Sequence, residues 1–367
     1  MPRIPFIEAK FARDDYKHDL LVDRFEKYLK QLRRSKTADI AGEDANADDY
    51  SLPELFDGSD TVALRRADQT KIARRVSKLV NAHLAATGID HLSDSDKKRL
   101  VGLRDGVEIV AIESEARADE IAADLHADMP WMAPATTVVW HALRRSVREG
   151  WTGVRLPPLL LSGPPGIGKS HFARRLAGLV GTSTDDIEAT HETAGFGISG
   201  LQKGWGTANP GRLLELILKT RIGNPIIVID EVEKAGVMVA KSGERHTLAD
   251  ALLPLLEPLS AKSWSCPYFR VRFDMSWVGW VMTANDHTRL PAPLLSRCPP
   301  VVLRDLTLAE VSQHIRFEGK RRGLSHVAID ATLEAVERHA GRHRIDLRLA
   351  GRLLDRAVDL QDGPVLN

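Results

Sequence analysis

The chain has 367 residues, of which 43% are hydrophobic and 28% are charged, and its formal net charge is +1. This balance is typical of a globular protein with two or three domains, and it excludes a uniformly basic protein that coats nucleic acid or membranes, although a local basic patch stays compatible with it. No run approaches the roughly 18 apolar residues of a membrane span. The chain has two cysteines, Cys266 and Cys298, and no secretion-type leader at its start, so we expect reduced thiols and a cytoplasmic location.

The first part of the chain is expected to be mostly helical. Apolar spacing predicts helices over residues 14–32, 70–86, 106–127 and 135–148, and the acidic segment 38–60 reads as a linker. The second helix carries Arg74, Arg75 and Lys78, which form either a solvated face or a basic patch. We interpret residues 1–130 as a helical N-terminal region that recognises a substrate or partner.

Short apolar runs alternate with amphipathic segments after residue 156. The runs are residues 159–161, 187–190, 226–229, 278–283 and 301–303. This alternation predicts an α/β fold, with a parallel sheet and helices on both faces, over residues 131–305. Helical patterns at 307–317, 330–339 and 347–360 predict a C-terminal helical domain over residues 306–367.

One glycine-rich segment lies between the first predicted strand and the helix expected at 171–180. Its residues are Gly163, Pro164, Pro165, Gly166, Ile167, Gly168, Lys169 and Ser170, with His171 next in the helix. The spacing G-x-x-x-x-G-K-S, between a strand and a helix, is typical of a loop whose backbone N–H groups hold phosphates. Lys169 is then expected to reach the β- and γ-phosphates, and Ser170 to hold Mg²⁺.

Two acids follow the buried strand 226–229. In an open α/β sheet, ligands bind beyond the carboxyl ends of the strands, so Asp230 is expected near Mg²⁺ and Glu231 is expected to orient or deprotonate a water. Asn285 follows the next strand and is a candidate to hold the same water, while Arg297 precedes the last strand and is a candidate to reach a neighbouring subunit's γ-phosphate.

These segments, in this order, resemble the AAA+ ATPases, and most closely the ATPase module of the Lon proteases. The strings that carry the closer resemblance are IDEVEK at 229–234, ALLPLLEP at 251–258, YFRVRFD at 268–274 and TAN at 283–285 running on to LPAPLLSR at 290–297. The resemblance covers roughly residues 130–362. It implies ATP and Mg²⁺ as ligands, and a ring of subunits, with a hexamer expected.

The resemblance also implies roles for individual residues. Residues 163–170 match Walker A, Asp230 and Glu231 match Walker B, Asn285 matches sensor 1 and Arg297 matches the arginine finger. Arg348 is the choice for sensor 2, with Arg344 as its rival. Trp205 takes the aromatic position of a substrate-gripping pore loop, with burial of its ring as the alternative. We expect no Ser-Lys protease domain after the helical region.

The sequence therefore supports an ATP-hydrolysing, ring-forming remodeller of protein substrates that has no protease domain. The alternative is a nucleic-acid-associated ATPase of the clamp-loader or transposition-helper type, motivated by Arg74, Arg75, Lys78 and by the basic run 320–322. A nucleotide-dependent scaffold with negligible turnover is a third interpretation.

Overall fold

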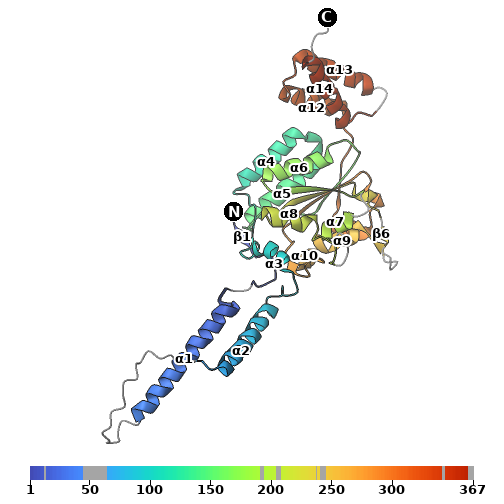
Figure 1. The fold of residues 1–367 in the computed structure, drawn as a ribbon. Coiled ribbons are helices and arrows are strands. Elements are labelled where there is room, and N and C mark those ends of the chain that lie inside the picture. Colours follow the sequence, from blue (N-terminus) through green and yellow to red (C-terminus); the bar gives the residue numbers. More distant parts are fainter. Residues whose placement is uncertain are drawn as a thin grey trace, which may run out of the picture. The chain divides into compact units, whose positions relative to one another are not determined.

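The computed structural model describes residues 1–11, 14–43, 64–190, 194–203, 208–236, 238–239, 245–340 and 344–362 (Figure 1). The chain divides into two compact units, one of residues 9–104 and one of residues 1–8 with 105–367. This partition does not test the predicted division at residues 130 and 305, which stays a prediction.

The described residues of the smaller unit form three α-helices. They are α1 His18–Glu43, α2 Arg66–Ala85 and α3 Asp94–Val101. Leu21 of α1 packs against Ile72 and Val76 of α2, and all three side chains are buried. The helices expected at 14–32 and 70–86 are confirmed. The linker or surface loop expected from residue 38 is wrong for 38–43, where α1 continues to Glu43, and its remainder lies mostly outside the described residues.

The larger unit is built on a parallel five-stranded sheet, which confirms the predicted α/β fold. The strands are β3 Leu159–Ser162, β4 Thr184–Glu188, β5 Ile226–Asp230, β10 Gly279–Ala284 and β11 Pro300–Val302, in the order β11-β3-β10-β5-β4. The three central strands, β3, β10 and β5, are almost entirely buried, as expected for strands covered on both faces.

Strand β4 is displaced from its predicted position. The sequence predicted residues 187–190, but the strand is Thr184–Glu188. Because β4 is an edge strand, its polar side chains face solvent and bond to neighbouring helices, as when Arg212 binds Asp185 and Arg174 binds Asp186. An apolar-run criterion therefore misses its first half.

Helices cover both faces of the sheet (Figure 1). Helices α4 Glu115–Asp128, α5 Ala133–Arg148 and α6 Lys169–Val180 lie on one face, and α7 Ala194–Ser199, α8 Arg212–Thr220 and α9 Leu248–Leu256 lie on the other. The remaining helices are α10 Pro258–Lys262, α11 Ala292–Arg297, α12 Leu308–Arg321, α13 His326–Ala340 and α14 Leu347–Asp362. Short strand pairs join β1 Arg3–Ile4 to β2 Val107–Glu108, β6 Met238–Val239 to β7 Arg245–His246, and β8 Trp264–Ser265 to β9 Arg272–Phe273.

The helix predicted at 106–127 begins later than expected. Gly106 has φ +81°, and a Cβ atom there would lie 2.2 Å from the carbonyl oxygen of Ile4, so this residue turns the chain into β2. Helix α4 starts only at Glu115, after Ser114 caps it by accepting a hydrogen bond from the Arg117 N–H. The local glycine turn and the pairing of β2 with β1 therefore override the apolar periodicity of residues 106–114.

The C-terminal helices share the core of the sheet domain. One buried apolar cluster includes Leu161 of β3, Phe172 of α6, Val311 of α12 and Leu354 of α14. This packing places α12 and α14 beside the loop that follows β3.

Cys266 and Cys298 are buried and form no disulfide, and burial raises the pKa of the Cys298 thiol to about 12. Within the described residues, no helix has the length and apolar character that crossing a bilayer requires.

Candidate functional site

The loops that carry the predicted site residues leave the sheet at the same edge. In the parallel register, Thr283 of β10 pairs with Leu161 of β3, and Met282 pairs with Ile229 of β5. The loops that follow these three strands therefore begin side by side. They carry the glycine-rich loop, the acid pair and Asn285, which the sequence had predicted to meet.

The glycine-rich loop adopts a conformation that needs its glycines. Gly166 and Gly168 have φ +79° and +95°, which side-chain-bearing residues rarely adopt. At Gly163 a Cβ atom would lie 2.6 Å from a backbone carbonyl oxygen. The Trp131 indole N–H donates to the carbonyl of Ile167 at 2.8 Å, so a buried ring supports the turn from behind. Helix α6 begins immediately afterwards, and the N–H groups of its first turn have no intrahelical acceptor.

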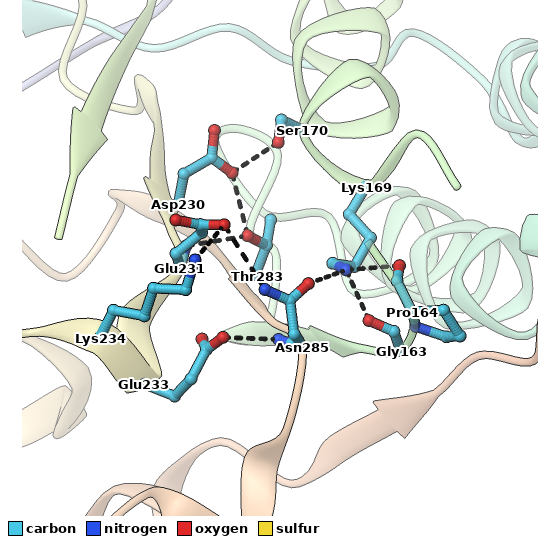
Figure 2. A network of polar contacts seen from close by, with 10 residues as sticks. All are labelled: Gly163, Pro164, Lys169, Ser170, Asp230, Glu231, Glu233, Lys234, Thr283 and Asn285. Carbon is cyan, nitrogen blue, oxygen red and sulfur yellow. Dashed lines mark hydrogen bonds and ion pairs between the residues drawn. The ribbon is translucent and has the colours of Figure 1, made fainter. Parts of the chain in front are cut away.

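Lys169 is buried at the start of α6, with 7% of its surface exposed. Its ammonium group donates to the carbonyl oxygens of Gly163 at 2.6 Å and Pro164 at 2.9 Å, and to Asn285 Oδ1 at 3.1 Å (Figure 2). Burial lowers the pKa of Lys169 to about 8, because the ammonium ion loses its hydration. A cation held by neutral oxygens in this way is suited to receive an anion.

Asp230 connects Ser170, the residue that follows the glycine-rich loop and Lys169, to Thr283 at the end of β10. Ser170 Oγ donates to Asp230 Oδ1 at 2.5 Å, and Thr283 Oγ1 donates to the same oxygen at 3.0 Å. The Thr283 hydroxyl in turn accepts from the Glu231 N–H at 3.1 Å. One threonine therefore fixes both acids of the predicted pair.

Glu231 occupies an unusual backbone conformation, with φ +56°, directly after β5. Its carboxylate lies 2.9 Å from the Lys234 ammonium and accepts a long bond of 3.5 Å from Asn285 Nδ2. The Lys234 hydrogen bond is the main cause that lowers the pKa of Glu231, so the carboxylate is ionised at neutral pH. The Asn285 N–H donates to Glu233 Oε1 at 3.0 Å, and Asn285 lies between Lys169 and Glu231 (Figure 2).

A cavity of about 580 Å³ opens over these residues. It is bounded by the glycine-rich loop, by the ends of β4, β5 and β10, and by α12 and α14. Those of its lining residues that the sequence had predicted are Pro165, Gly166, Gly168, Lys169, Ser170, His171, Asp230, Glu231, Asn285 and Arg348. The volume and the mixture of cationic, acidic and amide groups suit a phosphate-bearing ligand of nucleotide size.

The two sensor-2 candidates occupy different places. Arg348 lies on the cavity wall, whereas Arg344 pairs with Asp305 at 2.6 Å and donates to the Pro165 carbonyl at 2.9 Å. The chain between them closes over the loop, because the Leu347 N–H donates to the Gly166 carbonyl at 2.9 Å. This geometry favours Arg348 for contact with a ligand, whereas Arg344 holds the start of the C-terminal helical segment against Asp305 and Pro165.

Two predicted residues lie apart from this cavity or outside the described chain. Arg297 does not line the cavity; its guanidinium lies 3.6 Å from Glu257 Oε2 and donates to the Pro293 carbonyl at 3.2 Å. Trp205, the predicted pore residue, lies outside the described residues, so its role stays a prediction.

The donor set at Ser170 and Asp230 fits a magnesium ion. Both supply hard oxygen atoms, and Mg²⁺ is usually held by one or two protein oxygens together with water and substrate phosphates. Within the described residues, no group of three or more His, Cys, Asp or Glu side chains could hold a metal, so a site made of protein ligands alone is absent there.

Sequence reasoning missed several residues of the site. Thr283, Glu233 and Lys234 had no assigned role, although each lies next to a predicted site residue in the sequence. His314 and Glu318 of α12 also line the cavity although no motif marks them, and Arg321 was noted only as part of the basic run 320–322. Their positions follow from how the C-terminal helices pack, which a local pattern does not encode.

Comparisons with known proteins agree with this geometry. Residues 159–306 match the family described as AAA, ATPase family associated with various cellular activities. The chain is 27% identical over 230 residues to Lon protease 2 of Sorangium cellulosum, which is 59% of this chain and 28% of that protein. It is 31% identical over 225 residues to Lon protease of Desulfovibrio desulfuricans, which is 57% of this chain and 25% of that protein.

The chain thus matches only about a quarter of the length of these curated relatives. A solved closed-state structure of Hsp104 with a nucleotide analogue and casein overlaps 80% of this chain and 51% of its own, with 16% identity and a TM-score of 0.49. A TM-score below 0.5 carries no argument about the fold family. The relation to AAA+ ATPases therefore depends on the sequence matches and on the arrangement of the site. The AAA match over residues 159–306 and the Lon relatives at about 30% identity are consistent with a Lon-like AAA+ ATPase module in this region of the chain.

Proposed function

We propose that this protein hydrolyses ATP in the presence of Mg²⁺ and uses the energy to remodel protein substrates as a ring-forming relative of Lon. The observation that carries the proposal is the convergence of Lys169, Ser170, Asp230, Glu231 and Asn285 around one cavity at the carboxyl edge of the sheet. Phosphoryl transfer needs mainly positioning and electrostatic stabilisation, and this residue set can provide both.

In this proposal the chain's own groups divide the work. The N–H groups of the glycine-rich loop and the Lys169 ammonium bind the phosphates, while Ser170 and Asp230 hold Mg²⁺, which neutralises charge on the phosphate oxygens. Glu231 accepts a proton from the attacking water, and Asn285 orients that water. Arg348 contacts the bound phosphates from α14.

The proposal assigns Arg297 to the site of a neighbouring subunit. Within its own chain, this side chain makes one long ion pair and a hydrogen bond to a carbonyl, and it does not reach the cavity. A surface arginine near the last strand of the sheet is suited to act in trans in a ring with repeated head-to-tail contacts, for which we propose six subunits.

The protein substrate is part of the same proposal and depends on the similarity to Lon proteases and on the predicted pore position of Trp205. The proposed cytoplasmic location depends on the two cysteines, which form no disulfide. Residues 1–130 remain the proposed site of target recognition. A Trp205→Ala protein should keep its basal ATP turnover but lose stimulation by an unfolded protein.

Phosphate release by a Glu231→Gln protein tests the hydrolytic assignment. The amide keeps the shape of the side chain but cannot accept the proton, so we expect turnover to fall by about 10²-fold or more while nucleotide binding persists. Binding should be measured with a fluorescent ATP analogue, and Glu334→Gln on the exposed side of α13 serves as a control that should keep parental turnover. Equal turnover in the Glu231→Gln and parental proteins would contradict the base assignment.

The nucleic-acid-associated alternative loses one of its two supports. Arg321 and Arg322, from the basic run 320–322, bind Glu318, and Arg322 also binds Asp355. Arg321 and Arg322 line the proposed nucleotide cavity as well. The second support, formed by Arg74, Arg75 and Lys78 on α2, does not belong to the nucleotide cavity.

A further inference from the structure

Helix α2 of the smaller unit carries four cations on one face. Lys71, Arg74, Arg75 and Lys78 stand at positions i, i+3, i+4 and i+7, so they share one side of the helix over about 10 Å. All four side chains are exposed. We call these four residues the α2 basic face.

Among the described residues, no carboxylate forms an ion pair with the α2 basic face. The only acid on α2 is Asp68, and it is bound by Arg33 of α1 at 2.7 Å. Within the described part of the chain, none of the four cations lies within 4.0 Å of a carboxylate oxygen. The guanidinium carbon of Arg75 lies 6.0 Å from the centre of the Phe25 ring, which is a cation–π contact and not an ion pair. Four exposed cations on one face of a helix attract a polyanion.

The rest of α2 argues against a membrane as that polyanion. Ile72 and Val76 are buried against α1, so they are not available to enter a lipid surface. Leu79, 40% exposed, is the one large apolar side chain of α2 that is exposed, and a single side chain is too little apolar area to anchor a helix in a lipid surface. The exposed residues Ala67, Thr70 and Ala82 are small and let the helix approach a phosphate backbone closely.

We propose that the α2 basic face binds the phosphate backbone of duplex nucleic acid without reading its sequence. A straight row of cations matches the regular line of charges along one strand of a duplex. No exposed aromatic ring stands among these four cations, so they offer no stacking platform for unpaired bases. This surface is separate from the nucleotide cavity, and the proposal holds whether or not the protein remodels proteins.

Fluorescence anisotropy of the full chain with a labelled 30-base-pair DNA of random sequence tests the proposal. Contacts to about four phosphates should give a log–log salt slope of about −3 to −4, and affinity should fall about 10²-fold between 50 and 200 mM salt. Replacing Lys71, Arg74, Arg75 and Lys78 together by glutamine should weaken binding at 50 mM salt by more than about tenfold and remove most of the slope. A duplex RNA of equal length distinguishes the two forms of the ligand.

Two matched control proteins make the result decisive. Glutamine at Lys219, Lys262, Arg316 and Arg338 removes the same charge from exposed sites of the larger unit and should leave DNA binding unchanged. Exchanging lysine for arginine and arginine for lysine on the α2 basic face should also retain binding. Circular dichroism and basal ATP turnover should be unaffected in every variant. Absence of salt-dependent binding, equal loss in the distal control, or binding of phosphatidylserine vesicles in place of DNA would each overturn the proposal.

Discussion

At the scale of single residues, the site is organised by side chains that bond to two partners. Thr283 donates to Asp230 and accepts from the Glu231 N–H, while Asn285 contacts both Lys169 and Glu231. Each of these two residues links Glu231, the proposed base, to a residue proposed to bind Mg²⁺ or phosphate: Thr283 links it to Asp230, and Asn285 links it to Lys169. The distances between the acids and the lysine therefore depend on the end of β10 as much as on the two motifs themselves.

A Thr283→Val substitution should isolate this coupling. Valine has nearly the same shape, but it leaves the Glu231 N–H without its acceptor and removes one donor from Asp230, in a position that is 2% exposed. The unsatisfied groups should cost about 1–3 kcal/mol, and ATP turnover should fall by about tenfold or more. Thr283→Ser keeps the hydroxyl and should retain most of the turnover in a phosphate-release assay, so an equal loss in both proteins would argue against this role.

Gly166 is the residue where the loop and the C-terminal helices meet. Its φ is +79°, and a Cβ atom would lie 2.5 Å from Asp346 Oδ2. We expect Gly166→Ala to lower the free energy of unfolding by about 1–3 kcal/mol and to impair ATP binding, because backbone strain and the clash act together.

Gly178→Ala provides the matched control for Gly166→Ala. Gly178 lies within α6, and a Cβ atom there would meet no other atom within 4 Å. Alanine at this helical position should raise the free energy of unfolding by about 0.5–1 kcal/mol. Urea unfolding and nucleotide titration measure both variants, and a stable Gly166→Ala protein with parental ATP affinity would contradict the proposed fit.

At the scale of elements, the start of α12 determines where one wall of the cavity stands. Thr307 caps the helix by accepting from the Glu310 N–H, and Glu310 Oε2 accepts from the Thr307 N–H at 2.8 Å. Arg304 binds both carboxylate oxygens of Glu310, at 2.6 and 2.8 Å. The Arg304 hydrogen bond is the main cause that lowers the pKa of Glu310 to about 2.

This arrangement predicts a pH-dependent contribution to stability. Because the pKa of Glu310 is lower in the folded chain, its contribution is complete above the usual pKa near 4.5 and is lost as the pH falls toward 2. At neutral pH, Glu310→Gln should lower the free energy of unfolding by about 0.5–1 kcal/mol, since Arg304 is largely exposed.

Urea unfolding between about pH 7 and pH 3 measures this contribution. The difference between the parental and Glu310→Gln proteins should shrink as the pH falls, because the carboxylate becomes protonated in the unfolded chain first. Glu334→Gln, on the exposed side of α13, is the control and should show little difference at any pH. A difference for Glu310→Gln that does not change with pH would exclude the ion pair as its source.

At the scale of the whole molecule, the proposed site is incomplete within one chain. Every proposed catalytic group except Arg297 lines or adjoins one cavity, and Arg297 is held at Glu257 and Pro293 outside it. If the arginine acts in trans, each active site needs Glu231 from one subunit and Arg297 from the next. The two roles can then be separated in different chains.

Mixing two inactive variants tests this division. Arg297→Ala and Glu231→Gln proteins should each have little turnover, because arginine fingers contribute roughly 10³–10⁵ in rate in related systems. An equal mixture that exchanges subunits should recover up to about a quarter of the parental turnover, since one interface in four combines an intact Glu231 with an intact Arg297 across a head-to-tail contact. A double variant mixed with itself is the control, and a mixture without recovery would contradict action in trans.

The sequence by itself determined the strand–loop–helix at residues 159–180, the acid pair after β5 and the order of the central strands' motifs, because these depend on local spacing and on continuous apolar runs. It also predicted the helical nature of the two ends. Tertiary structure alone decided that Thr283 joins Asp230 to Glu231, that Lys234 pairs with Glu231, and that Arg348 faces the cavity while Arg344 does not. It also decided the bounds of the edge strand β4, and it made residues 106–114 a turn and a short strand where the sequence pattern predicted a helix. These outcomes depend on contacts between segments far apart in the chain, whose energies exceed the local preferences that a sequence pattern records.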